Sequence, residues 1–233
     1  MNPVLPPTAV VFDLDGTLLD SRGDIVAAIN HALLTTGRNP QPAQVIVRLV
    51  GDGPRALCAR AAKIPENAPE TDELIRLFLD YYREHPLDFT RWAKGALEAI
   101  EALSAMENMA LGICTNKHRG TTDVVLRALG IEDRFGAIVA GGDTKERKPD
   151  AAPLLLAAKQ LGSIPAAVVM VGDGIQDILC ARNAGTWAVG VESGFSAVEA
   201  LLQAGPDVTV PDLSMLPGIV QRWREPTTRI KLR

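Results

Sequence analysis

Short apolar runs alternate with helical patterns along most of this chain. The apolar runs, which we interpret as buried strands, cover residues 10–12, 109–114, 137–140, 167–171, 187–191 and, more weakly, 207–210. Helical spacing of apolar residues covers 97–106, 120–129, 151–161, 177–184 and 196–204. Strands that alternate with helices predict βαβ units, so we expect an α/β fold built on a parallel sheet.

Residues 22–89 break this alternation. Apolar residues recur there at helical spacing, as at Ile25, Ile29 and Leu33, and Asp24 is placed to cap the first helix. We therefore predict a helical domain at 22–89 inserted into an α/β core formed by 1–21 and 90–225, with a tail at 226–233. A helical insert that faces a strand-end site can act as a lid. A helical excursion that merely packs on the sheet gives the same pattern.

Two acids follow the first apolar run. The strand at 10–12 leads into Asp13 and Asp15, and Gly16 then breaks the pattern. In open α/β sheets ligands bind at the carboxyl ends of strands, and residues two apart in a strand start out on one face. Two carboxylates held close together repel unless a cation lies between them or one carries a proton, so the pair predicts either a metal site or an acid/base pair. A strand end followed by an Asp-Gly turn explains the same residues without any chemistry.

Two further strand ends carry residues that suit an anion. Thr115 and Asn116 follow an apolar run, where a hydroxyl, an amide and the N–H groups of the next turn can bond anionic oxygens. Lys148 precedes Pro149, which fixes the backbone and can start the next helix, so we expect the ammonium to be held at the site end of the sheet. There it can neutralise a carboxylate nucleophile and a phosphate. A turn or helix cap explains the first pair equally simply, and an exposed loop lysine explains the second.

A second acid pair follows the strand at 167–171. Asp173 lies between two glycines, and Asp177 begins the next helix, where its charge suits the helix dipole. Mg²⁺ takes oxygen ligands, so two or three carboxylates from different strand ends suit it. A Gly-Asp turn explains this motif when it is taken alone. Together, however, four strand ends present an acid pair, a Thr-Asn pair, a lysine and a second acid pair, and chance assembly of that set is far less probable than any single match.

This set of motifs resembles that of the haloacid dehalogenase superfamily. The matching segments are Asp13 to Thr17, Thr115-Asn116, Lys148-Pro149, and Gly172-Asp173 with Asp177. The resemblance implies a Rossmann-like three-layer core with a parallel sheet, and the insert is similar to that superfamily's helical C1 cap. Within the superfamily, residues 12–21, 49–57 and 170–191 are most similar to the bacterial phosphoglycolate phosphatases.

The resemblance implies magnesium-dependent hydrolysis of a small phosphomonoester through an aspartyl-phosphate. Asp13 is then the nucleophile, and Asp15 protonates the leaving oxygen and later deprotonates the attacking water. The catalytic set is Asp13, Asp15 and Lys148. The implied Mg²⁺ ligands are Asp13, Asp15 through its backbone carbonyl, Asp173 and Asp177. The implied phosphate-binding residues are Thr115, Asn116 and Lys148, with Asn116 also orienting its loop.

Several departures and alternatives bear on the subfamily more than on the chemistry. The subfamily usually has Ser where Gly174 stands and often has Asn where Gln176 stands. It also often has Asn in place of Asp52, and it commonly has Pro-Gly where this chain has Ala-Lys-Gly at 93–95. A β-phosphoglucomutase-like phosphotransferase carries a His soon after the nucleophile loop, which residues 21–30 lack. A dehalogenase lacks the second acid, so Asp15 argues against it. A sugar-phosphate phosphatase and a non-catalytic phospholigand-binding module stay as alternatives.

The cap turn at 51–55 is the candidate for substrate choice. It contains Gly51, Asp52 and Arg55, and Arg55 can pair with a substrate carboxylate such as that of phosphoglycolate. A surface arginine that opens a cap helix is an equal alternative. Asp52 argues against a strongly anion-seeking loop.

Composition removes several other classes. The chain has 233 residues, a net charge of −4 and 4% aromatic residues, which predicts no nucleic-acid partner. Three scattered cysteines (Cys58, Cys114 and Cys180) form no disulfide framework and predict reduced thiols in a cytoplasm. Residues 1–8 lack a signal pattern, and no apolar run approaches a membrane span. We expect a small phosphorylated metabolite as partner, no membrane, and a monomer or homodimer.

The last residues carry a basic excess. Arginines and a lysine at 222–224 and 229–233 predict a solvated, partly mobile terminus.

Overall fold

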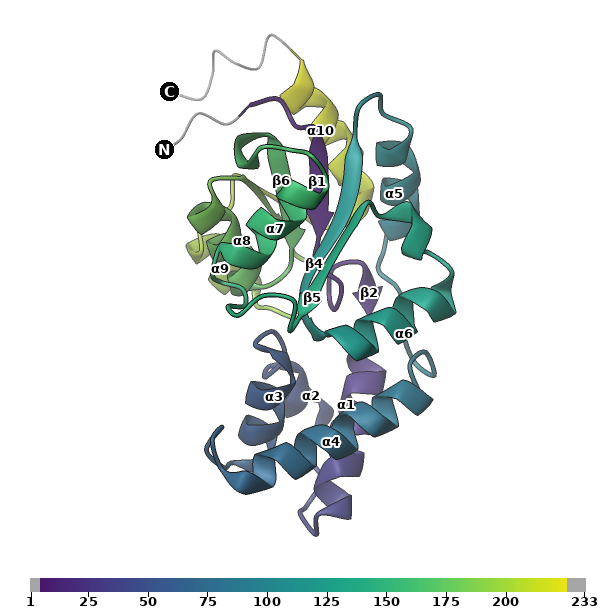
Figure 1. The fold of residues 1–233 in the computed structure, drawn as a ribbon, viewed down its shortest axis with the longest axis vertical. Coiled ribbons are helices and arrows are strands. Elements are labelled where there is room, and N and C mark those ends of the chain that lie inside the picture. Colours follow the sequence, from purple (N-terminus) through teal and green to yellow (C-terminus); the bar gives the residue numbers. More distant parts are fainter. Residues whose placement is uncertain (1–4, 226–233) are drawn as a thin grey trace.

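A six-stranded parallel sheet organises the chain in this computed structural model, which describes residues 5–225 (Figure 1). The strands lie in the order β5-β4-β1-β6-β7-β8, with the first strand of the chain near the centre. They are β1 (Ala9–Phe12), β4 (Ala110–His118), β5 (Ala137–Gly141), β6 (Val168–Gly172), β7 (Trp187–Val191) and β8 (Val208–Val210). Every neighbouring pair is parallel, as the alternation of apolar runs and helical patterns predicts.

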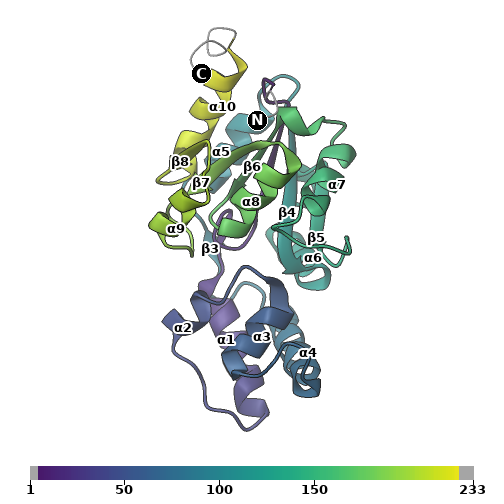
Figure 2. The same cartoon turned by 90° about the vertical axis from the view of Figure 1, so that its left-hand side faces the viewer.

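Helices cover both faces of this sheet, which gives three layers (Figure 2). They are α5 (Ala96–Ser104), α6 (Arg119–Leu129), α7 (Ala152–Gln160), α8 (Ile175–Ala184), α9 (Val198–Gln203) and α10 (Leu216–Arg224), with short 3₁₀ helices at Glu132–Arg134, Pro165–Ala167 and Leu213–Met215. Side chains alternate across β1, so Val10 and Phe12 pack with α5, α6 and α10. Ala9 and Val11 pack on the other face with α7, α8 and α9. The predicted α/β fold with a three-layer core is confirmed.

A separate group of helices lies beyond the carboxyl ends of the strands (Figures 1 and 2). They are α1 (Arg22–Thr35), α2 (Ala43–Val47), α3 (Gly53–Ala62) and α4 (Pro69–Glu84), and we call them the cap. The chain leaves the core through β2 (Leu19–Asp20) and returns through β3 (Arg91–Trp92), which pair antiparallel. The cap is therefore joined to the core at a two-stranded ribbon, close to the strand ends that carry the motifs.

Asp24 joins the cap to the returning segment. It lies in the first turn of α1 and is 2% exposed, and no side chain caps this helix. Its carboxylate accepts hydrogen bonds from the N–H of Phe89 (2.9 Å), the N–H of Thr90 (2.8 Å) and the hydroxyl of Thr90 (2.5 Å). The prediction that Asp24 caps the helix is wrong, because the returning chain brings three donors to the same carboxylate.

Replacing Asp24 with asparagine is expected to lower the free energy of unfolding by about 2 kcal/mol, because an amide N–H then faces backbone donors in a buried place. Urea unfolding measures the change. Asp88→Asn is the matched control, since Asp88 lies in the same segment with a side chain 51% exposed. That control is expected to change the free energy by less than about 0.5 kcal/mol. Equal effects of the two substitutions would contradict the role given to Asp24.

The last helix is anchored through Trp223. Its ring stacks on Trp187 of β7 with centroids 4.1 Å apart, and Arg224 Nη2 donates to the carbonyl oxygen of Glu107 (2.6 Å). The prediction of a mobile segment at 222–224 is therefore wrong, because α10 buries apolar side chains against the core. The tail at 226–233 lies outside the described residues.

None of the helices within residues 5–225 has the length and apolar character needed to cross a membrane.

Candidate active site

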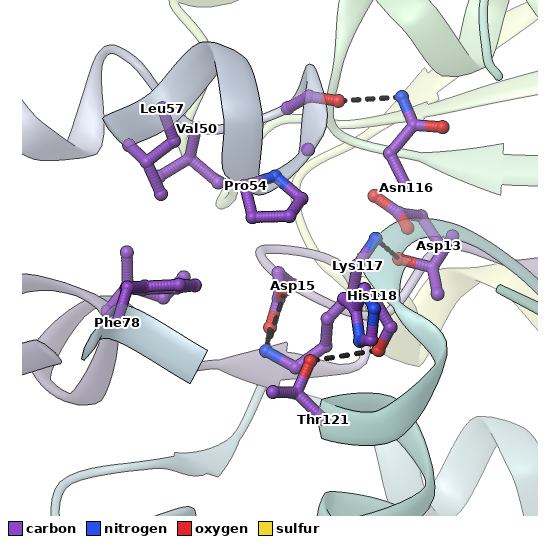
Figure 3. Close-up of a pocket in the computed structure, with 14 residues that line it drawn as sticks. Asp13, Asp15, Val50, Pro54, Leu57, Phe78, Asn116, Lys117, His118 and Thr121 are labelled. Carbon is purple, nitrogen blue, oxygen red and sulfur yellow. Dashed lines mark hydrogen bonds and ion pairs between the residues drawn. The ribbon is translucent and has the colours of Figure 1, made fainter. Parts of the chain in front are cut away.

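A pocket opens at the carboxyl ends of β1 and β4, between the sheet and the cap (Figure 3). The core residues that line it are Asp13, Asp15, Thr115, Asn116, Lys117, His118 and Thr121. The cap residues that line it are Ile25, Val50, Gly51, Gly53, Pro54, Leu57 and Phe78. The pocket therefore offers a polar, charged wall on the core side and an apolar wall on the cap side.

Lys148 joins Asp13 to Asp177 beneath this pocket. Its Nζ lies 3.0 Å from Asp13 Oδ1 and 2.6 Å from Asp177 Oδ1, and it donates to the carbonyl oxygen of Cys114 (2.7 Å). Burial alone would lower the pKa of Lys148, but the two carboxylates raise it above its ordinary value. With a side chain 2% exposed, Lys148 is a buried cation at the strand ends and not an exposed loop lysine.

Asp173 is held against the loop that follows β1. Thr17 Oγ1 donates to Asp173 Oδ1 (2.8 Å) and accepts from the N–H of Asp173 (3.1 Å), and the N–H of Phe195 donates to Asp173 Oδ2 (2.7 Å). Gly16 permits this close approach, because its φ is +90° and a Cβ there would lie 2.5 Å from Asp173 Oδ2. The turn after Asp15 thus brings the acids of β1 and β6 together.

Asp13, Asp173 and Asp177 form a set that could ligate a metal. One carboxylate oxygen of each lies within 4.8 Å of the others. Burial, reinforced by the charges of Asp177 and Asp13, raises the pKa of Asp173 to about 7. Burial also raises the pKa of Asp177, against the opposing effect of Lys148. Three carboxyl groups face one ammonium, so the set carries an excess of negative charge when the carboxyl groups are ionised.

One oxygen of this set has no hydrogen-bond partner within residues 5–225. Asp13 Oδ1 is buried and accepts no hydrogen bond from any described residue, although the Lys148 ammonium lies 3.0 Å away. A buried carboxylate oxygen whose one partner is an ion pair can still accept a further ligand. Oxygen-only donors with excess negative charge fit a hard divalent cation such as Mg²⁺.

Asp15 faces a second buried lysine. Lys117 Nζ lies 3.0 Å from both carboxylate oxygens of Asp15, and Ser21 Oγ donates to Asp15 Oδ1 (2.6 Å). Lys117 also donates to the hydroxyl of Tyr82 on α4 (2.9 Å). Asp13 and Asp15 both line the pocket (Figure 3). Each of these acids has a lysine beside it, Lys148 for Asp13 and Lys117 for Asp15.

Asn116 ties three segments together. Its Nδ2 donates to the carbonyl oxygens of Gly51 in the cap (2.8 Å) and Lys148 (2.9 Å), and its Oδ1 accepts from the N–H of Lys148 (3.0 Å). Both amide hydrogens are thus used on the backbone, so the side chain orients the loops. A contact of Asn116 with phosphate stays a prediction. Thr115 is 4% exposed and lines the pocket, as a phosphate-binding hydroxyl requires.

Two residues of the predicted cap turn lie at the boundary with the core. Gly51 lines the pocket, and Asp52 accepts hydrogen bonds from Gln176 Nε2 (2.9 Å) and Arg60 Nη1 (2.6 Å). Partial burial acts to raise the pKa of Asp52, but the bonds from Arg60 and Gln176 lower it. Asp52 therefore bridges the cap helix α3 and the core helix α8.

Arg55, the third residue of that turn, does not line this pocket. Its Nη2 pairs with Asp72, and its Nη1 donates to the carbonyl oxygen of Glu66 (2.8 Å). It lines a neighbouring hollow between the cap and the core loop at 141–147. Groups of the cap itself hold the guanidinium, so a role for Arg55 toward a substrate carboxylate stays a prediction that this geometry does not favour.

Neither Lys117 nor Tyr82 is predicted as a site residue from the sequence. A signal for Lys117 exists, because residues two apart on a strand share a face, and the reasoning that joined Asp13 to Asp15 also joins Thr115 to Lys117. Tyr82 has no such local signal, since a tyrosine on an amphipathic helix is ordinary core material.

Fold and site together define a class of protein. A parallel α/β sheet whose strand ends gather paired acids and a buried lysine, facing an inserted helical cap, is the architecture of a capped α/β phosphatase. The haloacid dehalogenase-like hydrolase family model matches residues 10–191, and the chain belongs to this family.

Known relatives agree with this assignment. A phosphoglycolate phosphatase of Agrobacterium fabrum is 36% identical over 215 residues, which cover 91% of both chains. An N-acetylmuramic acid 6-phosphate phosphatase of Pseudomonas aeruginosa is 35% identical over 187 residues, which cover 80% of this chain and 82% of the relative. The crystal structure of a predicted phosphoglycolate phosphatase of Haemophilus somnus matches with a TM-score of 0.84 at 28% identity, covering 93% of this chain and 99% of that chain. The protein is a phosphatase similar to the phosphoglycolate phosphatases of this family.

Proposed function

We propose that this phosphatase hydrolyses a small phosphomonoester with Mg²⁺ through an aspartyl-phosphate on Asp13. The observation that carries the proposal is the convergence of Asp13, Asp173, Asp177 and Lys148 at a pocket that Asp13 and Asp15 line. A carboxylate that attacks a phosphate dianion must overcome charge repulsion. Unit charges ~4 Å apart interact by about 4 kcal/mol at an effective dielectric of 20, so several fixed positive charges are needed.

Two acids divide the chemistry between them. In the first step a carboxylate oxygen of Asp13 attacks phosphorus, the bond from phosphorus to the ester oxygen breaks, and Asp15 in its protonated form gives that oxygen a proton. In the second step water attacks phosphorus and Asp15 accepts a proton from that water. The bond between phosphorus and Asp13 then breaks, which frees inorganic phosphate and restores the Asp13 carboxylate.

The remaining strand-end residues supply positive charge and positioning. Asp13, Asp173 and the backbone carbonyl of Asp15 would hold Mg²⁺, with Asp177 in direct or water-mediated support. When bound, the cation neutralises charge on the phosphoryl oxygens. Lys148 places a fixed positive charge beside the nucleophile, and Thr115 offers a hydroxyl to the phosphoryl group.

Phosphoglycolate is the leading substrate, supported by the named activity of the Agrobacterium fabrum relative. A sugar phosphate is the second candidate. The cap wall supports it, because Val50, Leu57 and Phe78 are apolar and suit the body of a larger leaving group. The activity named for the Pseudomonas aeruginosa relative supports it as well.

Release of inorganic phosphate from a panel that includes phosphoglycolate and N-acetylmuramic acid 6-phosphate tests the proposal. Activity with Mg²⁺ is expected to fall by about 10³-fold in excess chelator, because a divalent cation supplies several kcal/mol to the transition state. Added Mg²⁺ should restore it, and an unchanged melting temperature shows that the chelated protein is still folded.

The outcomes separate the alternatives. Highest kcat/KM on phosphoglycolate supports that substrate, whereas a preference for the sugar phosphate keeps the mechanism and changes the substrate. Activity that survives the chelator contradicts the metal dependence. Binding of a phosphate analogue without any turnover would instead support a phospholigand-binding module.

We also infer a cytoplasmic location for the protein. Cys58, Cys114 and Cys180 are buried free thiols, which suits a reducing compartment. A monomer or homodimer stays a prediction, which light scattering would test.

A further inference from the structure

Lys117 is a buried cation to which the proposed mechanism gives no role. Its side chain is 7% exposed, and its Nζ donates to both carboxylate oxygens of Asp15 at 3.0 Å and to the hydroxyl of Tyr82 at 2.9 Å. The ammonium also lies 4.0 Å from the centroid of the Tyr82 ring, within reach of a cation–π attraction.

These contacts cross the boundary between core and cap. Lys117 comes from β4 and Asp15 from the loop after β1, whereas Tyr82 comes from α4 of the cap and is 1% exposed. The Tyr82 ring also packs near Phe78, which lines the pocket (Figure 3). A movement of α4 away from the core would therefore remove a partner from Lys117 without touching Asp15 directly.

The two lysines of the site differ in this respect. Lys148 lies between Asp13 and Asp177, which both belong to the core, so its contacts do not depend on the cap. Lys117 is shared between the core acid Asp15 and the cap tyrosine. The lysine beside the nucleophile is thus held by the core alone, whereas the lysine beside the acid/base is held by the core and the cap together.

We propose that Lys117 is a positioning residue that fixes Asp15 for proton transfer, and that Tyr82 makes this positioning depend on a seated cap. The inference rests on the proposed function, in which Asp15 transfers the proton. A general acid must lie within hydrogen-bond reach of the leaving oxygen, and two contacts from Lys117 with one from Ser21 restrict rotation of the carboxylate. Proton transfer is then efficient when the cap lies against the core, which is also when the pocket is walled off from water.

The proposal predicts a dependence on the leaving group. An alkyl phosphate must lose a poor leaving group, so its first step needs the proton from Asp15. p-Nitrophenyl phosphate loses a stable phenolate and needs that proton far less. A defect in positioning Asp15 should therefore lower kcat/KM for the alkyl ester and spare the aryl ester, whereas a general disturbance of the pocket lowers both.

The experiment compares kcat/KM for 2-hydroxyethyl phosphate and p-nitrophenyl phosphate, with Mg²⁺, across a set of variants. Tyr82→Phe keeps the buried ring and removes the hydroxyl, and we expect a ~10-fold loss on the alkyl ester with less than ~2-fold on the aryl ester. Tyr81→Phe is the matched control, because Tyr81 lies next to it on α4 and stacks on His31 and His85. It should leave both values unchanged.

Variants of Lys117 complete the set. Lys117→Met is expected to lose ~100-fold on the alkyl ester and to show the same leaving-group pattern as Asp15→Asn, in weaker form. Lys117→Arg keeps a cation and should recover part of the loss. Affinity for orthovanadate, a phosphate analogue, should stay within ~2-fold of the unmodified protein in Tyr82→Phe, since phosphate binding needs no proton transfer.

Equal losses on both esters, or no loss on either, would overturn the inference. An alkyl-selective loss in Tyr82→Phe with an inert Tyr81→Phe would support it. Failure of the proposed function itself looks different, because the unmodified protein would then turn over neither ester, and the inference would fall with it. Urea unfolding of each variant shows whether a lost activity reflects a lost fold.

Discussion

Replacing Asp13 with asparagine is expected to lower kcat/KM for every phosphomonoester by ~10⁴-fold or more, because a reaction that forms a covalent intermediate loses its nucleophile. The substitution keeps the size of the side chain but removes the charge that attacks phosphorus and meets the cation. A second readout is direct. Acid quenching during turnover of a radiolabelled ester should trap a hydroxylamine-sensitive acyl phosphate in the unmodified protein and none in Asp13→Asn.

Asp20→Asn provides the control for this prediction. Asp20 lies seven positions further on, in β2, and its carboxylate pairs with the exposed Arg22. The same change of chemistry there is expected to leave kcat/KM within about 2-fold, since exposed ion pairs contribute little. If Asp13→Asn kept a tenth of the activity, direct attack by water would replace the aspartyl-phosphate route.

Replacing Lys148 with methionine is expected to cost about 3–5 kcal/mol of unfolding free energy, because it leaves the buried carboxylate of Asp177, and the partly exposed carboxylate of Asp13, without their cation. The side chains of Lys148 and Asp177 are each 2% exposed, so water cannot replace the lost pairing. We also expect ~10³-fold lower kcat/KM, since the fixed positive charge at the nucleophile is gone. Urea unfolding measures the first effect and phosphate release the second.

Lys145→Met is the matched control for Lys148. Lys145 lies three residues earlier in the same loop, and its side chain is 94% exposed. Its replacement is expected to change the free energy of unfolding by less than about 0.5 kcal/mol. If the two variants proved equally stable, the ion pairs of Lys148 would make no contribution to the free energy of unfolding. If Lys148→Met kept full activity, its place in the mechanism would be lost.

The strands could be predicted well because the burial of a strand shows in the apolar residues of its own short segment. The strands β1, β6 and β7 are buried on both faces, so each is a short apolar run in the sequence, and the observed β7 coincides with the predicted 187–191. Strand ends shifted slightly where the polar residues of the site continue the ladder. The clearest case is β4, which runs on to His118 where the apolar run stops near Cys114.

The residues that join core to cap could not be predicted in the same way. Asp24 meets Thr90 across 66 positions, and Lys117 meets Tyr82 across 35. Such contacts depend on how the cap packs against the core, and the spacing of apolar residues in either segment does not predict that packing. Arg55 shows the reverse case. The sequence suggests that it contacts the substrate, but in the structure it pairs with Asp72 and with the carbonyl oxygen of Glu66, both in its own cap.

The sequence by itself determined the α/β class, the order of apolar strands, the position of a helical insert and the acids, hydroxyl and lysine that meet at the strand ends. It could do so because parallel strands bring their carboxyl ends to one edge, so position along the chain implies position in space. The tertiary structure alone decided which of these groups touch. Packing between distant segments, which local patterns do not encode, forms the ion pairs of Lys148 and Lys117. It also sets the hydrogen bond from Asn116 to the cap and directs Arg55 away from the pocket.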